Sequence, residues 1–298
     1  MELHEIRYFL TLCRTLNFTR AADECHVSQP ALTRAIRKME DELGGALLFR
    51  ERNNTHLTQL GRMIEPHLSA TLARAEAAKQ AASNFLRLDS APLRLGTARC
   101  IGPERFVDLL TRFRAMHPGV ELALVEDEPQ QLCTVLESGG VDAALLPQPD
   151  LLPSLLQAHP LYREQYLIAC GTTHPLLRRN AVRVAELDGQ AYLSHAAGGD
   201  RDVPAEICAA SGARLACVLR SERLDWIMAM VAAGVGFCFL PEGAGTFPGV
   251  AARPLIDPPI MRDVCLATIA GRRWSAPLTA FIHALRLYRW PEPDRRAA

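Results

Sequence analysis

Residues 28 to 38 carry amide, hydroxyl, guanidinium and ammonium groups, the side-chain types that contact base edges and phosphates in DNA. In a helix, the 3.6-residue period would place these polar residues on one face. They are Gln29, Thr33, Arg34, Arg37 and Lys38, and Pro30 lies on the same face. The remaining face carries apolar residues at i, i+3, i+4 and i+7, namely Leu32, Ala35, Ile36 and Met39. The pattern predicts a helix that packs on one side and contacts a polar partner on the other.

Residues 17 to 39 are interpreted as two short helices joined by a tight turn. Ser28 is the predicted N-cap of the second helix, because its hydroxyl can accept a hydrogen bond from the amide of Ala31. Pro30 fits the first turn, where its missing N–H has no partner to lose. A simpler interpretation stays open at this point, namely a surface helix whose charged groups are solvated.

The flanking residues favour a small domain over an isolated surface helix. Upstream, an apolar stripe of the same spacing is formed by Ile6, Phe9, Leu10 and Cys13. Ala21, Ala22 and Cys25 are small enough for two helices to cross closely. Downstream, residues 47–58 contain a short hydrophobic run, an Asn53-Asn54 turn and a return toward Leu57, which predicts a two-stranded wing. The unit is therefore a predicted winged helix-turn-helix.

These sixty residues resemble the amino terminus of LysR-type transcriptional regulators. The matching segments are RYFL (7–10), NFTRAA (17–22), VSQPALTR (27–34), Ile36, ELG (42–44), LFR (48–50) and LTQLG (57–61). The sequence departs from the family at Gly45 and Ala46, which extend the small-residue turn, and at Gln59, where the family often has proline.

The resemblance implies a regulator that binds double-stranded promoter DNA, with a small-molecule effector and RNA polymerase as further partners. Base edges would be approached by Gln29, Pro30, Thr33 and Arg34. Phosphates would lie nearer Arg37 and Lys38, while Thr19, Arg20, Arg50 and Arg52 would anchor the second helix and the wing. Ser28 completes the predicted DNA-binding set as the helix cap.

Composition limits the other function classes. The formal net charge is zero, and residues 1–88 carry twelve Lys plus Arg against ten Asp plus Glu, so phosphate contacts must come from positioned arginines. No basic leader or membrane-length apolar stretch is visible, so we expect a cytoplasmic protein without membrane contact. Nine cysteines without a C-x-x-C motif predict reduced, mostly buried thiols and no metal or other cofactor.

Residues 61 to 88 form a long predicted helix with Pro66 near its beginning. A narrow stripe along it contains Leu68, Leu72, Ala75, Ala82 and Phe85 or Leu86. The resemblance implies that this linker helix pairs with that of a second subunit, giving a homodimer or homotetramer. The alternative is that the stripe packs on the chain's own C-terminal domain.

Beyond residue 92, short apolar strands alternate with helices. Strands are predicted at 93–96, 120–126, 141–146, 165–170, 192–193, 216–219, 236–240 and 263–270, and helices at 103–116, 130–138, 203–211, 224–233 and 277–288. The first βαβαβ run predicts a parallel sheet. Looser family matches occur at LRLG (93–96), HP (117–118), GVDAAL (140–145), HPL (174–176), VAAGVG (231–236) and LP (240–241).

The expected fold is thus an N-terminal all-α winged helix-turn-helix at 1–60, a linker and dimerisation helix at 61–90, and a C-terminal α/β two-lobed effector-binding domain at 91–298. By resemblance, the domain is similar to periplasmic solute-binding proteins, with lobe I at about 91–161 and 266–298 and lobe II at about 162–265. Ligands in such folds bind between the lobes, beyond the carboxyl ends of strands.

Candidate effector-binding residues follow from family position and are Thr97, Arg99, Cys100, Gln148, His195 and Phe237. For each, an ordinary structural role is the competing interpretation. The loop at 96–102 leads from a strand into a helix, so its amides and Thr97 could bind an anion or another polar ligand.

Three other interpretations remain to be tested. Cys208 and Cys217 are spaced like the cysteine pair of peroxide-sensing family members, but Gly199 stands at the position of the reactive cysteine and Cys208 at that of the resolving one. We therefore expect Cys208 and Cys217 to pack in one lobe rather than to form a redox switch. No catalytic signature surrounds any Cys or His, and the glycine pairs near residues 234 and 243 lack a dinucleotide-binding context, so we expect no enzyme. The last alternative is a solute-binding or protein-contact module without specific DNA binding.

Overall fold

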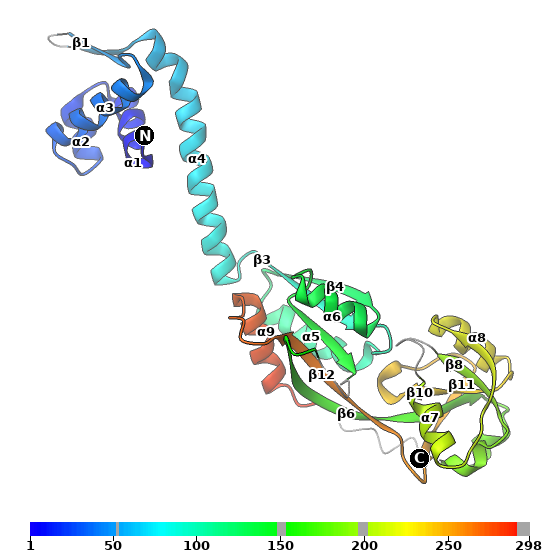
Figure 1. Ribbon diagram of the computed structural model, residues 1–298. Helices are drawn as coiled ribbons and strands as arrows, with labels where there is room; N and C mark the ends of the chain where they lie inside the picture. Colours follow the sequence, from blue (N-terminus) through cyan, green and yellow to red (C-terminus); the bar gives the residue numbers. More distant parts are fainter. Residues whose placement is uncertain (52–53, 148–152, 196–201, 291–298) are drawn as a thin grey trace. The chain divides into compact units, whose positions relative to one another are not determined.

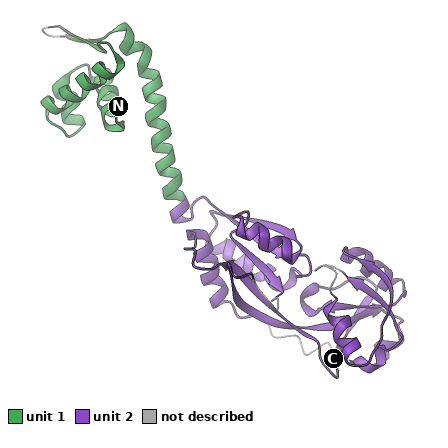
Figure 2. Cartoon of the chain, in the orientation of Figure 1, with its two compact units in different colours: residues 1–84 green, residues 85–298 purple. Residues whose placement is uncertain are grey.

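The computed structural model describes residues 1–51, 54–147, 153–195 and 202–290 of the 298-residue chain. It divides into two compact units, residues 1–84 and residues 85–298 (Figure 2). Within the described residues, no helix has both the length and the apolar composition needed to cross a bilayer.

Three helices enclose the core of the first unit. They are α1 (Leu3–Thr15), α2 (Phe18–Glu24) and α3 (Gln29–Leu43) (Figure 1). The buried apolar residues of this core include Ile6, Phe9, Leu12, Ala21, Ala22, Leu32, Ile36 and Met39. The predicted helix-turn-helix is confirmed, and its apolar stripes face one another.

Local capping sets the limits of α3. The Ser28 hydroxyl accepts a hydrogen bond from the Ala31 amide at 3.4 Å, as predicted, and a proline occupies the first turn. The helix ends at Leu43 and is capped by Gly44, whose φ of +75° lies in the left-handed region that favours glycine. The cap fixes which residues of α3 lie at its amino-terminal end.

The predicted wing is present as an antiparallel pair formed by β1 (Leu48–Glu51) and β2 (Asn54–Leu57). Its return strand leads to Thr58, whose hydroxyl donates to the Ala46 carbonyl at 2.7 Å and accepts from the Gly61 amide at 2.9 Å. A Cβ on Gly61 would lie 2.3 Å from the Leu47 carbonyl oxygen, so this close approach requires glycine. The wing is thereby attached to the start of the next helix.

Helix α4 (Gln59–Arg87) has 29 residues and continues through Pro66. Residues spaced by four along its first half pack against the core of the first unit, and these are Leu60, Ile64, Leu68 and Leu72. The predicted partner stripe therefore needs correction, because Leu68 and Leu72 contact the chain's own N-terminal helices. Further along the same helix, Ala82 and Leu86 are exposed.

The second unit begins with the predicted βαβαβ run. Its elements are β3 (Ala91–Ala98), α5 (Glu104–Met116), β4 (Val120–Asp127), α6 (Pro129–Glu137) and β5 (Ala143–Pro147). Strand β3 pairs in parallel with both β4 and β5, which confirms the expected parallel sheet. Helix α9 (Ala276–Leu287) returns to this half, and Phe281 packs edge-to-face on Phe113 within a continuous apolar core.

Two long strands, β6 (Leu156–Gly171) and β12 (Met261–Ile269), connect the two halves of this unit. They pair with each other, and β6 continues into a second half, where it pairs with β10 (Phe237–Pro241) and β11 (Val250–Ile256). With β8 (Ala191–His195) and β9 (Ala216–Ser221) included, the strand order is β4-β3-β5-β12-β6-β10-β8-β9. Figure 1 shows β3 and β4 in one half and β8, β10 and β11 in the other. For β6 the sequence predicted only the part at 165–170, and β11 was not predicted.

The second half is completed by shorter elements around its own apolar core. They are β7 (Val182–Arg183), β8 (Ala191–His195), α7 (Val203–Ala210), β9 (Ala216–Ser221) and α8 (Leu224–Ala232), with 3₁₀ helices at Pro175–Arg178, Val184–Leu187 and Glu242–Ala244. Buried residues of the second half form clusters separate from the core of the first half. The two-lobed α/β architecture is therefore confirmed.

Candidate functional site

The exposed face of α3 holds the predicted DNA-contacting side chains. Thr33 is half-buried, and exposed positions are Ser28, Gln29, Pro30, Arg34, Arg37 and Lys38. On the opposite side Leu32, Ile36 and Met39 are completely buried. The fold therefore holds one side of α3 against the core and leaves the polar side accessible to a partner.

The ammonium group of Lys38 has an internal partner. Its Nζ lies 2.7 Å from Oε1 of Glu5, whose side chain is 4% exposed. The hydrogen bond with Glu5 raises the pKa of Lys38. Burial alone would raise the pKa of Glu5, but the hydrogen bonds from Lys38 and from the Glu2 amide lower it below its usual range. Lys38 thus attaches α3 to α1.

The predicted anchoring residues lie at the start of α2 and in the wing. The Asn17 side chain caps α2 by accepting a hydrogen bond from the Arg20 amide at 3.0 Å. Thr19 and Arg20 are exposed, and Arg20 forms an ion pair with Glu24 at 3.4 Å. Arg50 belongs to β1, where its backbone pairs with that of Thr55. Arg52 lies outside the described residues.

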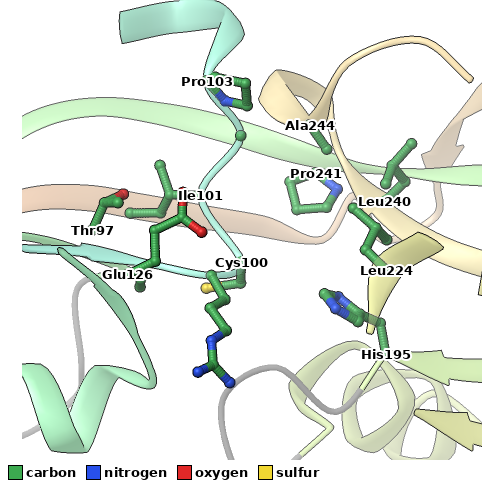
Figure 3. Close-up of a pocket in the computed structure, with 13 residues that line it drawn as sticks. Thr97, Cys100, Ile101, Pro103, Glu126, His195, Leu224, Leu240, Pro241 and Ala244 are labelled. Atoms are coloured by element: carbon green, nitrogen blue, oxygen red, sulfur yellow. The ribbon is translucent and has the colours of Figure 1, made fainter. Parts of the chain in front are cut away.

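A cavity of about 160 Å³ lies between the two halves of the second unit. One wall is formed by the loop after β3 and by the end of β4, and includes Thr97, Ala98, Arg99, Cys100, Ile101, Gly102, Pro103 and Glu126. The other wall is formed by His195, Leu224, Leu240, Pro241 and Ala244. Figure 3 shows Thr97, Ile101 and Glu126 on one side, opposite Leu240, Pro241 and His195. The carboxyl ends of β3, β4, β8 and β10 meet here, where open α/β sheets commonly bind ligands.

The structure brings four of the six predicted effector-binding residues together around this cavity, namely Thr97, Arg99, Cys100 and His195. The prediction for Phe237 needs correction. Its side chain is completely buried and packs on Tyr192 and Phe239, with ring centroids 5.4 and 5.6 Å apart, because its position in β10 points it into the apolar core. Gln148 lies outside the described residues.

Sequence reasoning missed Glu126 and the apolar wall at Leu240 and Pro241. Glu126 could have been found, because it ends the strand after the one that leads to Thr97, and parallel strands end at the same edge of a sheet. The apolar wall could not be recognised in the same way, because its sequence is typical of a buried strand.

Two polar side chains of the cavity lining contact residues next to the cavity. Arg99 forms two ion pairs: its Nη2 lies 3.7 Å from Asp127 Oδ1, and its Nη1 lies 3.6 Å from Glu128 Oε1. The His195 Nε2 donates a hydrogen bond to the Glu222 carbonyl at 3.0 Å when that nitrogen carries the proton. Burial lowers the pKa of His195, which favours the neutral imidazole at neutral pH.

A buried ion pair lies behind both walls of the cavity. Arg262 Nε donates to Glu164 Oε1 at 2.7 Å, and the two residues are opposite one another in β12 and β6. Arg262 also donates to the Cys100 carbonyl at 2.9 Å, while Glu164 accepts from the Gly243 amide at 3.0 Å. One ion pair is therefore hydrogen-bonded to a loop from each half.

A second cationic side chain joins this network from α5. Arg105 Nη2 lies 3.1 Å from Glu242 Oε2 and its Nε lies 3.7 Å from Glu164 Oε2. The two halves also approach at their backbones, since a Cβ on Gly102 would lie 2.0 Å from the Gly243 carbonyl oxygen. The geometry of the cavity thus depends on charged groups that the sequence analysis did not identify.

The cysteines do not form a disulfide among the described residues. Cys208 is completely buried in α7, and burial raises the pKa of its thiol to about 11. The expectation that Cys217 packs with it needs correction, because Cys217 is exposed on β9. Gly199 lies outside the described residues. No three carboxylate, thiol or imidazole groups within the described ranges converge closely enough to bind a metal ion.

Both parts of the chain match models of known protein families. Residues 3–62 match the model of the bacterial regulatory helix-turn-helix proteins of the lysR family, and residues 87–288 match that of the LysR substrate binding domain. The chain belongs to the LysR family of transcriptional regulators. Both predicted parts of the resemblance are confirmed, including the effector-binding domain.

Several individual relatives of this LysR-family chain are named for peroxide responses. It is 32% identical over 276 residues to the DNA-binding transcriptional dual regulator OxyR of Escherichia coli, covering 91% of this chain and 90% of the relative. It is 31% identical over 276 residues to the hydrogen peroxide-inducible genes activator of Haemophilus influenzae, covering 91% of each. Both relatives are named as regulators of gene expression.

Solved structures of similar fold cover nearly the whole chain. A full-length OxyR variant from Pseudomonas aeruginosa is 27% identical, with a TM-score of 0.69, covering 96% of this chain and all of the other. Full-length CbnR in complex with its target DNA is 19% identical, with a TM-score of 0.70, covering 96% of this chain and 99% of the other. The second likeness concerns the fold alone.

Proposed function

We propose that this LysR-family protein binds promoter DNA by placing α3 in the major groove and changes its DNA complex when a small molecule enters the cavity. The main support for DNA binding is that α3 has two different sides. One side is apolar and buried, and the other is exposed and contains Gln29, Arg34 and Arg37. Amide and guanidinium groups in this position reach base edges and phosphates. CbnR, whose fold this chain shares, was solved in complex with its target DNA.

Within this proposal, the residues on and around α3 have different roles. Gln29, Thr33 and Arg34 read bases, with Pro30 packed alongside, and Arg37 contacts phosphate. Lys38 is bound to Glu5 in the free protein, so a phosphate contact from its ammonium group would compete with that ion pair. Thr19, Arg20, Arg50 and Arg52 remain candidates for the flanking backbone contacts.

A gel-shift titration tests DNA binding directly. The purified full-length protein is titrated against the DNA upstream of its own gene, with excess unrelated DNA as competitor. A discrete complex that survives the competitor and weakens steeply with added salt supports the proposal, because phosphate contacts release counterions. A folded protein that forms no such complex would favour a solute-binding or protein-contact role instead.

The proposed effector site is the cavity lined by Thr97, Arg99, Cys100 and His195. Its support is geometric, since both halves of the second unit contribute walls and ligand binding would favour one spacing of these walls over another. The resulting population shift would alter how paired DNA-binding domains engage two half-sites.

Oligomerisation is part of the proposal. The second half of α4 leaves Ala82 and Leu86 exposed, and a two-fold partner would cover such a stripe while supplying the second DNA-binding domain. A homodimer or homotetramer in the cytoplasm, with RNA polymerase as a further contact and no catalytic activity, completes the proposed function.

The names of the relatives raise thiol-based peroxide sensing as a second candidate. The sequence places glycine at 199, where the resemblance puts the reactive cysteine, and the Cys208 thiol is buried with a raised pKa. A thiolate is the reactive form of cysteine, so Cys208 is a poor reactant at neutral pH. We therefore favour a non-covalent effector over a Cys208 switch.

A further inference from the structure

A buried carboxylate of α1 binds a cation on the exposed side of α3. Lys38 lies four residues after Arg34 in this helix, so both side chains belong to the same exposed face. The Lys38 side chain is 59% exposed, yet its Nζ lies 2.7 Å from Oε1 of Glu5, whose side chain is only 4% exposed. An ammonium group on the proposed DNA-binding face is therefore bound by the protein itself.

The Glu5 carboxylate is held in place by its own helix. Its Oε2 accepts a hydrogen bond from the Glu2 amide at 2.8 Å, which is part of the capping box at the start of α1. The carboxylate cannot move outward with Lys38 without losing this bond as well. If Lys38 left alone, Glu5 would keep a buried negative charge without its cationic partner, which is strongly unfavourable.

A DNA phosphate would offer Lys38 less than Glu5 does. Contacts between exposed charges are weakened by water and screened by salt, whereas a partly buried pair is screened much less. Exchange of Glu5 for a phosphate would also leave the Glu5 charge uncompensated inside the domain. We therefore expect the ion pair to persist when α3 contacts DNA.

A second ion pair connects α3 to the same end of α1. The α-ammonium group of Met1 lies 2.6 Å from Oε2 of Glu42. Glu42 follows Lys38 by four residues, so the two lie one turn apart along one side of α3. Their partners, Met1 and Glu5, both lie at the start of the chain. A rotation of α3 that carried Lys38 away from α1 would disturb both ion pairs.

We propose that Glu5 is a positioning residue for DNA binding, whose carboxylate takes the place of a DNA phosphate as the partner of Lys38. This inference rests on the proposed DNA binding by α3 and gives Lys38 a role other than the phosphate contact expected from sequence. Lys38 holds α3 on α1 in the free protein and in the DNA complex. Because phosphate contacts add affinity for every sequence alike, the ion pair limits the part of binding that carries no sequence information.

The salt dependence of DNA binding tests this role. Fluorescence anisotropy gives the affinity of the full-length protein for the DNA upstream of its own gene and for scrambled DNA of equal length. In Glu5→Gln, Lys38 should turn to a phosphate, because a neutral amide binds an ammonium group less strongly than an anion does. The slope of log affinity against log salt should become steeper by about 0.9, the value for one added phosphate contact. That slope corresponds to about threefold more loss of affinity between roughly 50 and 200 mM salt, on both DNAs alike.

Two further variants assign the effect to the Lys38 ammonium group. Asp41→Asn removes an exposed carboxylate from the same helix and leaves the Glu5–Lys38 pair intact, so its slope should equal that of the wild type. The double variant Glu5→Gln/Lys38→Gln should also return to the wild-type slope. A general loosening of the domain by the Glu5 substitution would instead persist in the double variant.

Lys38→Gln alone provides a test that does not need the Glu5 variant to fold. If Lys38 is bound to Glu5 in the complex, its replacement should leave the slope unchanged. If Lys38 contacts a phosphate in the wild-type complex, the slope should become shallower by about 0.9. The two roles of Lys38 thus give different results in the same titration.

The inference is overturned by a wild-type slope in the Glu5 variant or by a shallower slope in Lys38→Gln. It is equally overturned if the steeper slope persists in the double variant or appears in Asp41→Asn. A specific wild-type complex together with any of these outcomes would reject the role of Glu5 and leave the proposed DNA binding intact. A folded wild-type protein that forms no salt-dependent complex with either DNA would overturn both.

Discussion

Arg262 and Glu164 form an ion pair in the strands that join the two halves of the effector-binding domain. Arg262 Nη2 lies 2.6 Å from Glu164 Oε1, and the side chains are only 8% and 1% exposed. Each partner also bonds to a different wall of the cavity, Arg262 to Cys100 and Glu164 to Gly243. The ion pair therefore connects both walls of the cavity to the paired strands β6 and β12.

Removing the charge of Glu164 should be strongly destabilising, because Arg262 would remain buried without a carboxylate. We expect Glu164→Gln to lower the free energy of unfolding by about 3–5 kcal/mol in a urea titration. The matched control, Glu121→Gln on an exposed site, should change it by less than about 0.5 kcal/mol. Cys100 should also react faster with a thiol reagent in the native Glu164 variant, whereas the Cys217 rate stays constant. Equal stability of the two variants would refute this role.

Arg34 should carry sequence information in DNA binding. Arg34→Ala is expected to weaken binding to the specific site by about 1–3 kcal/mol and to relax the base preference, because a bidentate base contact is lost. Fluorescence anisotropy with specific and scrambled DNA measures both effects. Arg114→Ala removes the same charge from an exposed position on α5 and should alter neither. An equal loss of affinity for both DNAs in the Arg34 variant would contradict base reading.

The Glu5–Lys38 ion pair should make the stability of the first unit dependent on pH. The pKa of Glu5 lies below its ordinary value of 4.5 in the folded protein, so its contribution is fully present above pH 4.5 and is lost as the pH falls through the folded pKa. The pKa of Lys38 lies above 10.5, so its contribution is present below that pH and disappears as the pH rises through the folded pKa.

Glu5→Gln tests this dependence. At pH 7 we expect a loss on the order of 1–2 kcal/mol in the free energy of unfolding, since a buried charge-assisted hydrogen bond is weakened. The loss should shrink as the pH falls below 4.5, where Glu5 of the unfolded chain takes up a proton, and should disappear below the lower pKa of the folded protein. Glu76→Gln, which removes an exposed ion pair with Arg7, should give a much smaller effect at pH 7. A pH-independent difference between wild type and the Glu5 variant would exclude the ion pair as its cause.

Thiol reactivity should separate this protein from a peroxide switch that uses Cys208. Cys217 is exposed and Cys208 is buried with a pKa of about 11, so a thiol reagent should label Cys217 in the native protein and Cys208 after unfolding. Treatment with hydrogen peroxide should produce no Cys208–Cys217 disulfide by mass spectrometry. A peroxide-induced change in DNA binding that thiol reductant reverses and Cys208→Ser abolishes would establish the redox alternative.

The N-terminal domain was largely predictable from sequence because its determinants are local. The cap at Ser28, the glycine after α3 and the stripes at Ile6 and Leu32 act over one to four residues, so they can be read directly along the chain. The packing of the linker helix could not be predicted from local sequence patterns. Its stripe predicted a partner surface, but only the packing of the unit shows that Leu68 and Leu72 face the chain's own core.

In the effector-binding domain, the sequence alone determined the alternation of strands and helices, the parallel sheet and the loop from Thr97 to Cys100, since hydrophobic periodicity and strand ends are local properties. Only the tertiary structure decided that Phe237 points into the core, that Glu126 joins the cavity, and that Glu164 meets Arg262. The last pair is separated by 98 residues along the chain. Such contacts depend on strand register and side-chain direction across distant elements, and a one-residue change of register would reverse the face on which each side chain lies.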